Sequence, residues 1–315
     1  MTISKKLETI QKALCLTQSK LAEKVGVSFP SLNSWMSGKS IPRSKNSKII
    51  EDLFLEVTGQ KQIPEENLQR KKRILLYKTL GYKSVLREVL NNPDIRDQFV
   101  LKLTYHSNSI EGSTLTESNT ASIIFNDIAL ANKSLVEHLE AKNHQTALLY
   151  IFDYLNKGQK IDENLILKLH SILMNGIRPD AGVYRNHTVR IVGVHLPTSN
   201  YMSIQKNISE LISFAEKVLS KNKPDIIFLI SRFHSRFEQI YPFSDGNGRV
   251  GRLLMNAFLL NFNIAPAIIR QEKKQLYYTY LYKSQTKDDY SQFEDYVCDA
   301  IMDGFMVLER EDTVW

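Results

Sequence analysis

The sequence has few of the features that mark secreted, metal-stapled or membrane proteins. Its two cysteines, Cys15 and Cys298, lie in different halves of the chain and show no metal-ligand spacing. A disulfide framework and a zinc site are therefore not expected. We expect a location in the reducing cytoplasm. No run of about 18 apolar residues occurs, so no membrane span and no membrane partner are expected. The N-terminus lacks the apolar run and cleavage site of a signal peptide and predicts a helix.

Low-complexity tracts and internal repeats are also missing from the sequence. Hydrophobic residues make up 43% and charged residues 24%, which is the balance of a soluble globular protein. A chain of 315 residues is too long for one ordinary core. The length therefore predicts a small and a large domain.

Charge is distributed unevenly along the chain. The net charge is +7, and the first fifty residues alone hold nine Lys or Arg against two acidic residues. The rest of the chain is electrically balanced. A polyanionic partner is therefore expected to dock on the N-terminal segment, although a solvated basic face would have the same composition.

The N-terminal segment has the pattern of several short helices. Apolar residues of 5–16 recur on one helical stripe, Thr17 is placed to cap a second helix that ends at Gly26, and Ser28 is placed to cap a third that ends at Gly38. A further apolar stripe over 49–55 closes the core. Short helices with a tight glycine turn between the second and third are typical of a helix-turn-helix.

The string LTQSKLAEKVGVSFPSLNSWMSGKSIP, residues 16–42, resembles the phage-repressor (Xre-type) family. The resemblance covers about residues 5–58 and implies that the third helix enters the major groove of DNA. It places Leu21, Leu32 and Trp35 in the core, and Met36 stands where the family usually has an acidic residue. The residues implied to contact DNA bases or phosphates are Gln18, Phe29, Ser31, Asn33, Ser34, Lys39 and Arg43. A helix-turn-helix used only for protein contacts remains an alternative.

The remaining chain predicts an all-α fold with one exception. We expect a DNA-binding domain of four to five helices over 1–60, a linker and connecting helix over 61–95, and a helical domain over 96–315. The exception is 184–197, where alternating apolar residues around Gly193 predict a small β-hairpin.

The segment YPFSDGNGRVGR, residues 241–252, carries the strongest chemical pattern. A glycine-rich turn that opens a helix presents backbone N–H groups at the positive end of the helix dipole, which favours an anion. Arg249 and Arg252 are three residues apart and therefore share a helix face. Arginine suits bidentate phosphate contacts, and Asp245 beside phosphates is a natural Mg²⁺ ligand. The set predicts a di- or triphosphate site with its metal.

The same segment resembles the Fic (Fido) family motif H-P-F-x-D/E-G-N-G-R-x-x-R, and the resemblance extends over roughly residues 75–305. HSNSIEGSTLT, residues 106–116, is similar to the inhibitory motif of that family, with Ser107, Glu111 and Gly112 at its key positions. GVYRNHTVRIVGVHLP is similar to the flap that holds a target peptide. Lys287 departs from the family, which usually has glycine there.

The resemblance implies a protein AMP transferase, which moves AMP from ATP to a Ser, Thr or Tyr hydroxyl. It implies that Asp245 holds Mg²⁺, that Gly246, Asn247 and Gly248 cradle phosphates, and that Arg249 and Arg252 contact the β and γ phosphates. Glu111 is implied to pair with Arg252 and block the site. The flap, through Val189, Ile191 and Val194, is implied to clamp an extended segment of a target protein or of the chain itself.

Position 241 departs from the motif, because the family has a histidine there that acts as general base. Tyrosine has an ordinary pKa near 10, so roughly one molecule in a thousand is ionised at pH 7. Loss of general-base assistance costs a factor of about 10²–10⁴ in rate. His234 lies about two helical turns away on the same helix, roughly 10 Å, which is too far for it to replace this base. We interpret it as a structural histidine. Roles for His187 and His195 stay open.

Three interpretations remain open at this stage. The chain is an AMP transferase with Tyr241 at an atypical base position, or an ATP-binding pseudoenzyme that reports to its DNA-binding domain. The third is a DNA-binding regulator whose larger domain serves as a dimerisation body. DNA binding is expected on a short palindrome as a homodimer, with steep salt dependence.

Overall fold

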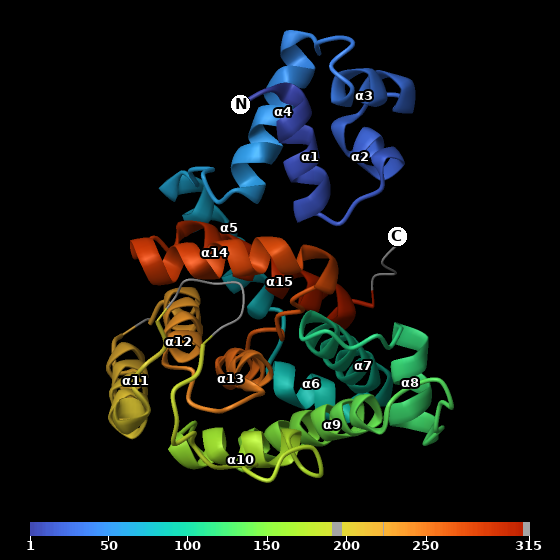
Figure 1. Cartoon of the computed structure of the whole chain (residues 1–315). Helices are drawn as coiled ribbons and strands as arrows, with labels where there is room; N and C mark the ends of the chain where they lie inside the picture. The colour runs from blue at the N-terminus through green and yellow to red at the C-terminus, as the bar shows by residue number, and fades with distance from the viewer. Residues whose placement is uncertain (191–196, 223, 311–315) are drawn as a thin grey trace. The chain divides into compact units, whose positions relative to one another are not determined.

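The computed structural model describes residues 1–190, 197–222 and 224–310 (Figure 1). Within these ranges the chain is helical and contains no strand, which confirms the all-α class for the described residues. The chain divides into two compact units. A smaller unit comprises 1–64 and 272–293, and a larger unit comprises 65–271 and the chain from 294 onward.

The smaller unit begins with four helices that follow the sequence pattern closely. They are α1 (Ile3–Ala13), α2 (Gln18–Val25), α3 (Phe29–Met36) and α4 (Ser44–Val57). The Thr17 and Ser28 side chains accept hydrogen bonds from the first turns of α2 and α3, as N-cap residues do. Gly26 ends α2 with a φ of 74°, a conformation that a glycine adopts without strain. The predicted turn between the second and third helices is therefore present.

The core of the smaller unit is apolar, and Leu21, Leu32 and Trp35 are buried in it. A second segment completes this unit: a short 3₁₀ turn (Gln271–Lys273) leads into α14 (Lys274–Lys287), which packs on α4. The Tyr280 hydroxyl donates to the Glu56 carbonyl oxygen at 3.1 Å. The helix-turn-helix segment is thus joined by a helix from near the C-terminal end of the chain.

The larger unit is a helical assembly. Its helices are α5 (Glu65–Thr79), α6 (Val85–Asn91), α7 (Pro93–Ile110), α8 (Glu117–Asn126), α9 (Leu135–Asn156), α10 (Glu163–Leu173), α11 (Ile204–Leu219), α12 (Ile226–Ile240), α13 (Asn247–Asn261) and the greater part of α15 (Ser291–Leu308), with a 3₁₀ turn at Tyr201–Ser203.

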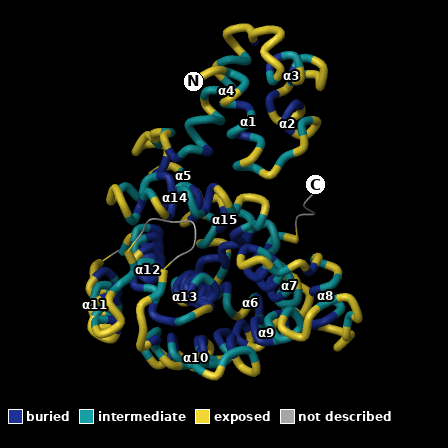
Figure 2. Tube along the Cα trace, in the orientation of Figure 1, coloured by how far each residue is buried: buried dark blue, intermediate teal, exposed yellow. Residues whose placement is uncertain are grey.

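Helix α13 lies at the centre of the larger unit. Its residues from Arg249 to Leu260 are all buried, and α6, α7, α9, α10 and α12 pack around it (Figure 2). In its first turn only Gly248 is partly exposed, and at its far end Asn261 is exposed. The loop that precedes α13 joins this buried helix to α12 and includes the exposed Asp245.

The predicted hairpin over 184–197 is not seen. Residues 184–190 and 197–200 carry neither helix nor strand. Ile191 and Val194, two of the three predicted flap residues, lie outside the described residues, and so does His195. Val189 is described, and its carbonyl oxygen accepts a hydrogen bond from the Thr198 hydroxyl at 3.1 Å.

Candidate functional site

The loop between α12 and α13 is held by its own side chains. Tyr241 caps the end of α12 in the left-handed conformation, with a φ of 52°. Asn247 binds Phe243 twice: its Oδ1 accepts from the Phe243 N–H and its Nδ2 donates to the Phe243 carbonyl oxygen, both at 2.9 Å. Phe243 is fully buried. The family resemblance implies that Asn247 cradles phosphates; in this structure its side-chain amide is engaged within the loop.

His170 of α10 supports the same loop and was not singled out from the sequence. Its ring stacks on Phe243 with centroids 3.7 Å apart, and its Nε2 lies 3.2 Å from the Asp245 carbonyl oxygen. The Gly182 N–H donates to the other ring nitrogen at 2.8 Å. Burial lowers the pKa of His170 to about 4, so the ring is neutral and can donate from Nε2. The histidine is a structural support of the loop.

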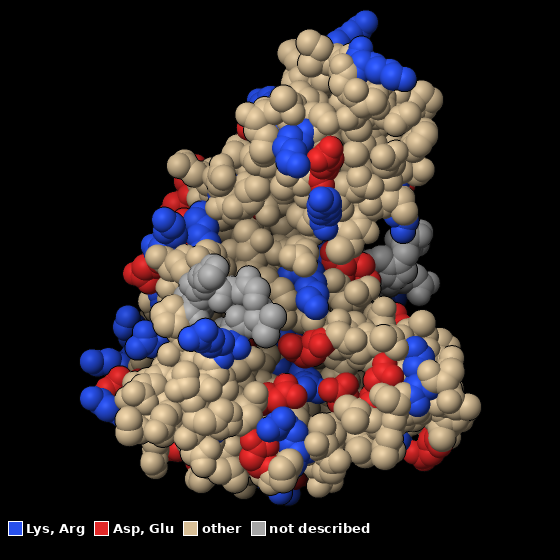
Figure 3. All heavy atoms as spheres, viewed as in Figure 1, with Lys and Arg blue, Asp and Glu red and all other residues tan. Residues whose placement is uncertain are grey.

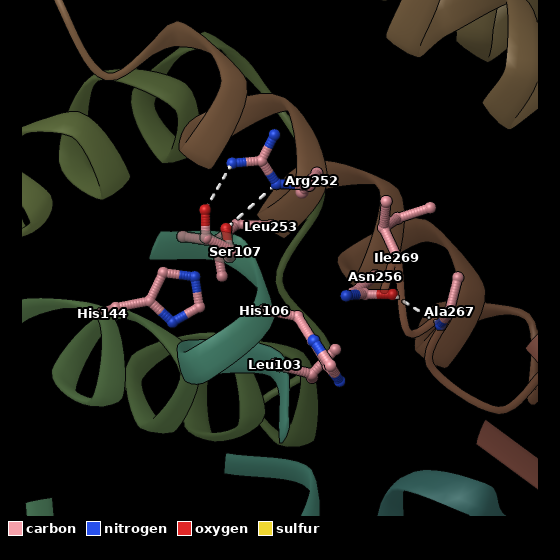
Figure 4. A pocket seen from close by; sticks show the side chains of 9 residues that line it. All are labelled: Leu103, His106, Ser107, His144, Arg252, Leu253, Asn256, Ala267 and Ile269. Carbon is pink, nitrogen blue, oxygen red and sulfur yellow. Dashed lines mark hydrogen bonds between the residues drawn. The ribbon is translucent and has the colours of Figure 1, made fainter. Parts of the chain in front are cut away.

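Arg252 is enclosed by the end of α7. Its Nε donates to the Ser107 hydroxyl and its Nη2 to the Ser107 carbonyl oxygen, each at 3.0 Å (Figure 4). Nη2 also donates to Glu111 Oε1 at 2.6 Å. A Cβ built on Gly248 would collide with that same Glu111 oxygen. The Glu111 carboxylate therefore lies directly over the first turn of α13.

Arg249 has a different carboxylate partner. Its Nη1 donates to Glu140 Oε1 of α9 at 2.5 Å, and its Nη2 lies 3.5 Å from Asp245 Oδ1. The Arg249 side chain is 4% exposed and the Glu140 side chain 17%. Nothing in the local sequence around Glu140 distinguishes it from other glutamates on a helix, so sequence reasoning missed it.

Two acidic groups near the start of α13 are held neutral. Burial, followed by the negative charges of Glu238, Glu111 and Asp245, raises the pKa of the Tyr241 phenol to about 12. Burial also raises the pKa of the Glu238 carboxyl to about 8, against the opposing effect of Arg252. Both groups are therefore protonated at pH 7. Neither is an available proton acceptor in this state.

The buried histidines of this region are also held neutral by burial, which moves their pKa in the opposite direction. Burial, then the positive charge of Arg252, lowers the pKa of His234 and of His144 to about 3. His144 Nδ1 lies 3.0 Å from the Thr104 hydroxyl. Both side chains are 1% exposed. An imidazole with so low a pKa and so little access to solvent is a poor proton acceptor for an incoming hydroxyl.

A small cavity lies behind Arg252, between α7, α9 and α13 (Figure 4). His106, Ser107, His144 and Asn256 contribute polar atoms to its wall. Its volume of about 10 Å³ suits a single water molecule rather than a nucleotide. A nucleotide would have to bind on the outer side of the loop, where Asp245 is half exposed.

Asp245 is the residue that could hold a metal ion. Its side chain is 53% exposed, and Oδ1 accepts a hydrogen bond from the Gly246 N–H at 2.6 Å. Among the described residues no three His, Cys, Asp or Glu side chains gather into a metal-binding cluster. A single carboxylate nevertheless fits Mg²⁺, which binds few protein ligands and completes its shell with water and phosphate oxygens.

The predicted DNA-contacting residues lie along α2, α3 and the loop after α3. Phe29, Asn33, Lys39 and Arg43 are exposed, whereas Gln18, Ser31 and Ser34 are half-buried. Ser34 Oγ lies 2.7 Å from Ser40 Oγ, which fixes its hydroxyl locally. Few acidic side chains appear on the visible face of this unit (Figure 3).

None of the described helices is long and apolar enough to cross a lipid bilayer. Residues 160–259 match the sequence model of the Fic/DOC family, and residues 11–55 match that of the helix-turn-helix. The chain therefore carries a Fic/DOC domain preceded by a helix-turn-helix domain.

Curated relatives carry the name protein adenylyltransferase Fic. The protein of that name from Nematostella vectensis is 36% identical over 189 residues, which cover 58% of this chain and 43% of the relative. The one from Culex quinquefasciatus is 32% identical over 200 residues, covering 62% of this chain and 39% of the relative. The match thus spans less than half the length of these relatives.

Solved structures share the fold. A Fic domain containing signaling protein from Bacteroides thetaiotaomicron has a TM-score of 0.68 at 22% identity, over 77% of this chain and 99% of its own. Fic-1 (residues 134–508) from C. elegans has a TM-score of 0.67 at 20% identity, over 97% of this chain and 92% of its own. At these identities the likeness establishes the fold.

Proposed function

We propose that the larger unit binds ATP at the start of α13 and transfers AMP to a protein hydroxyl, and that Glu111 holds it in an inhibited state. The observation that carries the proposal is the position of the Glu111 carboxylate, which lies on Gly248 and binds Arg252. A helix N-terminus beside an arginine attracts an anion, and here an internal anion lies there. The names of the relatives support adenylyl transfer as the reaction.

In the open state, Arg252 would exchange Glu111 for the terminal phosphate of ATP. The Ser107 contacts would keep the guanidinium in place, because they do not involve the carboxylate. Asp245 would hold Mg²⁺, which supplies charge neutralisation for the phosphates when bound. Arg249 and the N–H groups at Gly248 would complete the phosphate-binding turn.

Tyr241 limits the chemistry. With a pKa of about 12, roughly one molecule in 10⁵ carries a phenolate at pH 7, so Tyr241 does not act as a general base. Phosphoryl-type transfer depends mainly on positioning and electrostatics, so slow transfer survives without a base. We therefore infer a slow transferase in which Tyr241 contributes to the shape and hydrogen bonding of the site.

A nucleotide-sensing protein without transfer is the second candidate. It is favoured by the neutral state of Tyr241 and by the burial of His234, which leave the described part of the site without an evident proton acceptor. In that case ATP would displace Glu111 and change the larger unit without chemistry. The two candidates share the binding step and differ in the covalent product.

For the smaller unit we propose sequence-specific DNA binding as a homodimer through α3, with Lys39 and Arg43 on phosphates. Both residues are exposed and lie between α3 and α4, where Arg43 is the N-cap residue of α4. Gel shift with DNA from the region upstream of its own gene, at several salt concentrations, tests this. A Lys39→Ala, Arg43→Ala variant is expected to weaken binding on all sequences and to reduce the salt slope by about two.

The decisive experiment compares the native chain with Glu111→Gly and Glu111→Gln, in Mg²⁺ and α-³²P-labelled ATP. Glu117→Gln in the first turn of α8, where the side chain is 43% exposed, serves as the matched control. Label on protein in the two Glu111 variants, and little in the native chain or the control, supports an inhibited AMP transferase. ATP binding by calorimetry without label supports the sensor. Neither label nor binding contradicts both candidates.

A further inference from the structure

The cavity behind Arg252 is lined by three helices and by the chain that follows α13. Its walls come from α7, α9, α13 and residues 267–269. Three of the lining residues carry polar atoms whose hydrogen-bonding capacity the protein does not use up, namely Ser107, His144 and Asn256. Because each of the three belongs to a different helix, one small molecule in the cavity could join all three helices.

The His144 ring uses only one of its two nitrogens within the protein. Its Nδ1 lies 3.0 Å from the Thr104 hydroxyl, whereas its Nε2 is buried and has no hydrogen-bond partner among the described residues. The ring is neutral, because burial lowers its pKa to about 3, so Nε2 either donates or accepts one hydrogen bond. A buried nitrogen of this kind is costly unless another group satisfies it.

The hydroxyl of Ser107 is likewise only partly used. Its oxygen accepts the proton of Arg252 Nε at 3.0 Å, but in the described part of the chain nothing accepts the hydroxyl proton itself. A hydroxyl that donates a hydrogen bond is also a better acceptor, because consecutive hydrogen bonds polarise one another. A group that takes this proton would therefore strengthen the bond between Ser107 and Arg252.

The side-chain amide of Asn256 is fixed in orientation by the backbone. Its Oδ1 accepts a hydrogen bond from the Ala267 N–H at 2.8 Å, so the amide cannot be turned over and Nδ2 must lie at the other end. Figure 4 shows this nitrogen turned away from Ala267. It has no partner within the ranges that the structure describes. Asn256 therefore offers a donor to the cavity.

The size and charge of the cavity limit what can occupy it. A volume of about 10 Å³ is that of one water molecule. Ser107, His144 and Asn256 supply three hydrogen-bonding partners, and about three is the usual number for a buried water. A metal cation is disfavoured, because the Arg252 guanidinium lines the same cavity and repels it.

We propose that this cavity is a binding site for one water molecule, which joins His144 and Asn256 to the Ser107 hydroxyl and thereby holds Arg252 in place for ATP. The role in ATP binding rests on the proposed function, whereas the water site itself does not. His144 is then a positioning residue, because it acts on Arg252 through the water and Ser107. This support stays in place when Glu111 leaves, since the Glu111 carboxylate takes no part in it.

The water site is tested by a crystal structure of the native full-length chain, at a resolution that shows ordered waters. We expect a peak at roughly 2.6–3.2 Å from His144 Nε2, Ser107 Oγ and Asn256 Nδ2. Crystals soaked in bromide distinguish a water from an anion, because bromide has an anomalous signal. A cavity without a peak, or a bromide signal at this position, would overturn the proposal.

The role of the water is tested in the Glu111→Gly background, by calorimetry with ATP and Mg²⁺. His144→Phe keeps a ring in place and removes both nitrogens, whereas Ser107→Ala removes the hydroxyl. The matched control is His138→Phe, the same substitution on the same helix, at a histidine whose hydrogen bonds go to backbone atoms outside the cavity.

His144→Phe and Ser107→Ala should each raise the Kd for ATP about tenfold, since an unsatisfied buried polar group costs about that factor. The double variant should bind ATP no more weakly than Ser107→Ala alone, because both changes act through the same water. His144→Gln returns a donor and an acceptor to the cavity, so its Kd should lie between those of His144→Phe and the parent. The control should stay within about twofold of the parent.

Effects on the Kd that multiply in the double variant would overturn the role of the water, as would a Kd for His144→Phe equal to that of the parent. Should His144→Phe not fold, His144→Gln replaces it in the cycle under the same requirement. If Glu111→Gly itself binds no ATP, the proposed ATP site fails, and the crystal structure of the native chain still decides the water site.

Discussion

Two arginines on one face of α13 are neutralised by carboxylates of different character. Arg252 binds Glu111, which caps the C-terminus of α7, has a side chain 30% exposed, and precedes Gly112 with a φ of 109°. Arg249 binds Glu140, which lies inside α9 and is 17% exposed. A residue at a helix end can move by changes in both backbone and side-chain torsions, whereas Glu140 within α9 can move only through its side-chain torsions. The difference is the reason that we propose Glu111 as the partner that ATP displaces and Glu140 as the one that stays.

The largest expected effect comes from restoring a base once the displaceable partner is gone. In the Glu111→Gly background, Tyr241→His should raise labelling from α-³²P-ATP by about 10²–10⁴-fold, because imidazole accepts a proton near pH 7. In the native background the gain should be far smaller, since Glu111 still occupies the site. Equal gains in both backgrounds would mean that Glu111 does not restrict the nucleotide.

Removal of Arg252 and removal of Arg249 should have different effects on ATP binding and on the response to Glu111→Gly. Arg252→Ala should weaken ATP binding by about 30-fold or more, since loss of one partner from a buried charge pair costs about 2–5 kcal/mol. In the Arg252→Ala background, Glu111→Gly should cause no further change in ATP affinity, because the two residues act as one unit in a double-mutant cycle. Arg249→Ala should weaken ATP binding but preserve the effect of Glu111→Gly. Calorimetry on the six proteins measures both; a silent Glu111→Gly beside Arg249→Ala would contradict the assignment.

The two glutamates should have opposite effects on ATP affinity and unequal effects on stability. Glu111→Gln should tighten ATP binding about tenfold and cost less folding stability than Glu140→Gln, because the Ser107 hydroxyl and carbonyl oxygen still accept hydrogen bonds from Arg252. Glu140→Gln should weaken ATP binding and cost about 3 kcal/mol, because it leaves Arg249 buried without its counter-ion. Asp153→Asn, an exposed position on the same helix, is the control. Denaturant titration and calorimetry check the contrast, and tighter ATP binding in Glu140→Gln would refute it.

A third carboxylate, Glu238, sharpens the comparison because it is held neutral. Its pKa of about 8 lies well above the ordinary value of 4.5. Between pH 6.5 and 8 the unfolded chain has an ionised Glu238 and the folded chain a protonated one, so folded stability should fall as the pH rises. The loss should be roughly 1 kcal/mol per pH unit.

Titration of the buried histidines does not contribute to the change in stability between pH 6.5 and 8. The lowered pKa values of His144, His170 and His234 make their contribution fully present above pH 6.5 and lost only in more acidic solution. Glu238→Gln should therefore flatten the stability curve between pH 6.5 and 8, as measured by denaturant titration at each pH. A curve that keeps its slope in this variant would show that Glu238 is ionised in the folded protein.

Local sequence signals predicted much of the fold. The caps at Thr17 and Ser28 and the glycine turn at Gly26 are short-range features, and each is present where the pattern placed it. The Glu111–Arg252 pair was also expected, but from a family resemblance rather than from spacing, because the two residues are 141 positions apart.

The remaining features depend on tertiary contacts that leave no local pattern. His170 and Glu140 look like ordinary helix residues until α10 and α9 pack against the loop. Arg185 lies in a stretch that the sequence marked as a hairpin and flap, and its side chain bonds backbone carbonyl groups, which every residue type has. The sequence also placed residues after 96 in one domain, whereas 272–293 joins the smaller unit.

Because the smaller unit consists of two separate segments, 1–64 and 272–293, it cannot be isolated by a single cut in the chain. The Tyr280 hydroxyl and the Glu56 carbonyl meet across 224 positions of chain, within the smaller unit. A truncation after residue 64 would therefore remove a structural helix from the part it was meant to isolate. A graft onto another protein would need two segments cut and joined at three points. End-to-end fusion of two separate domains does not produce such an arrangement, so an isolated smaller unit must contain both of its segments.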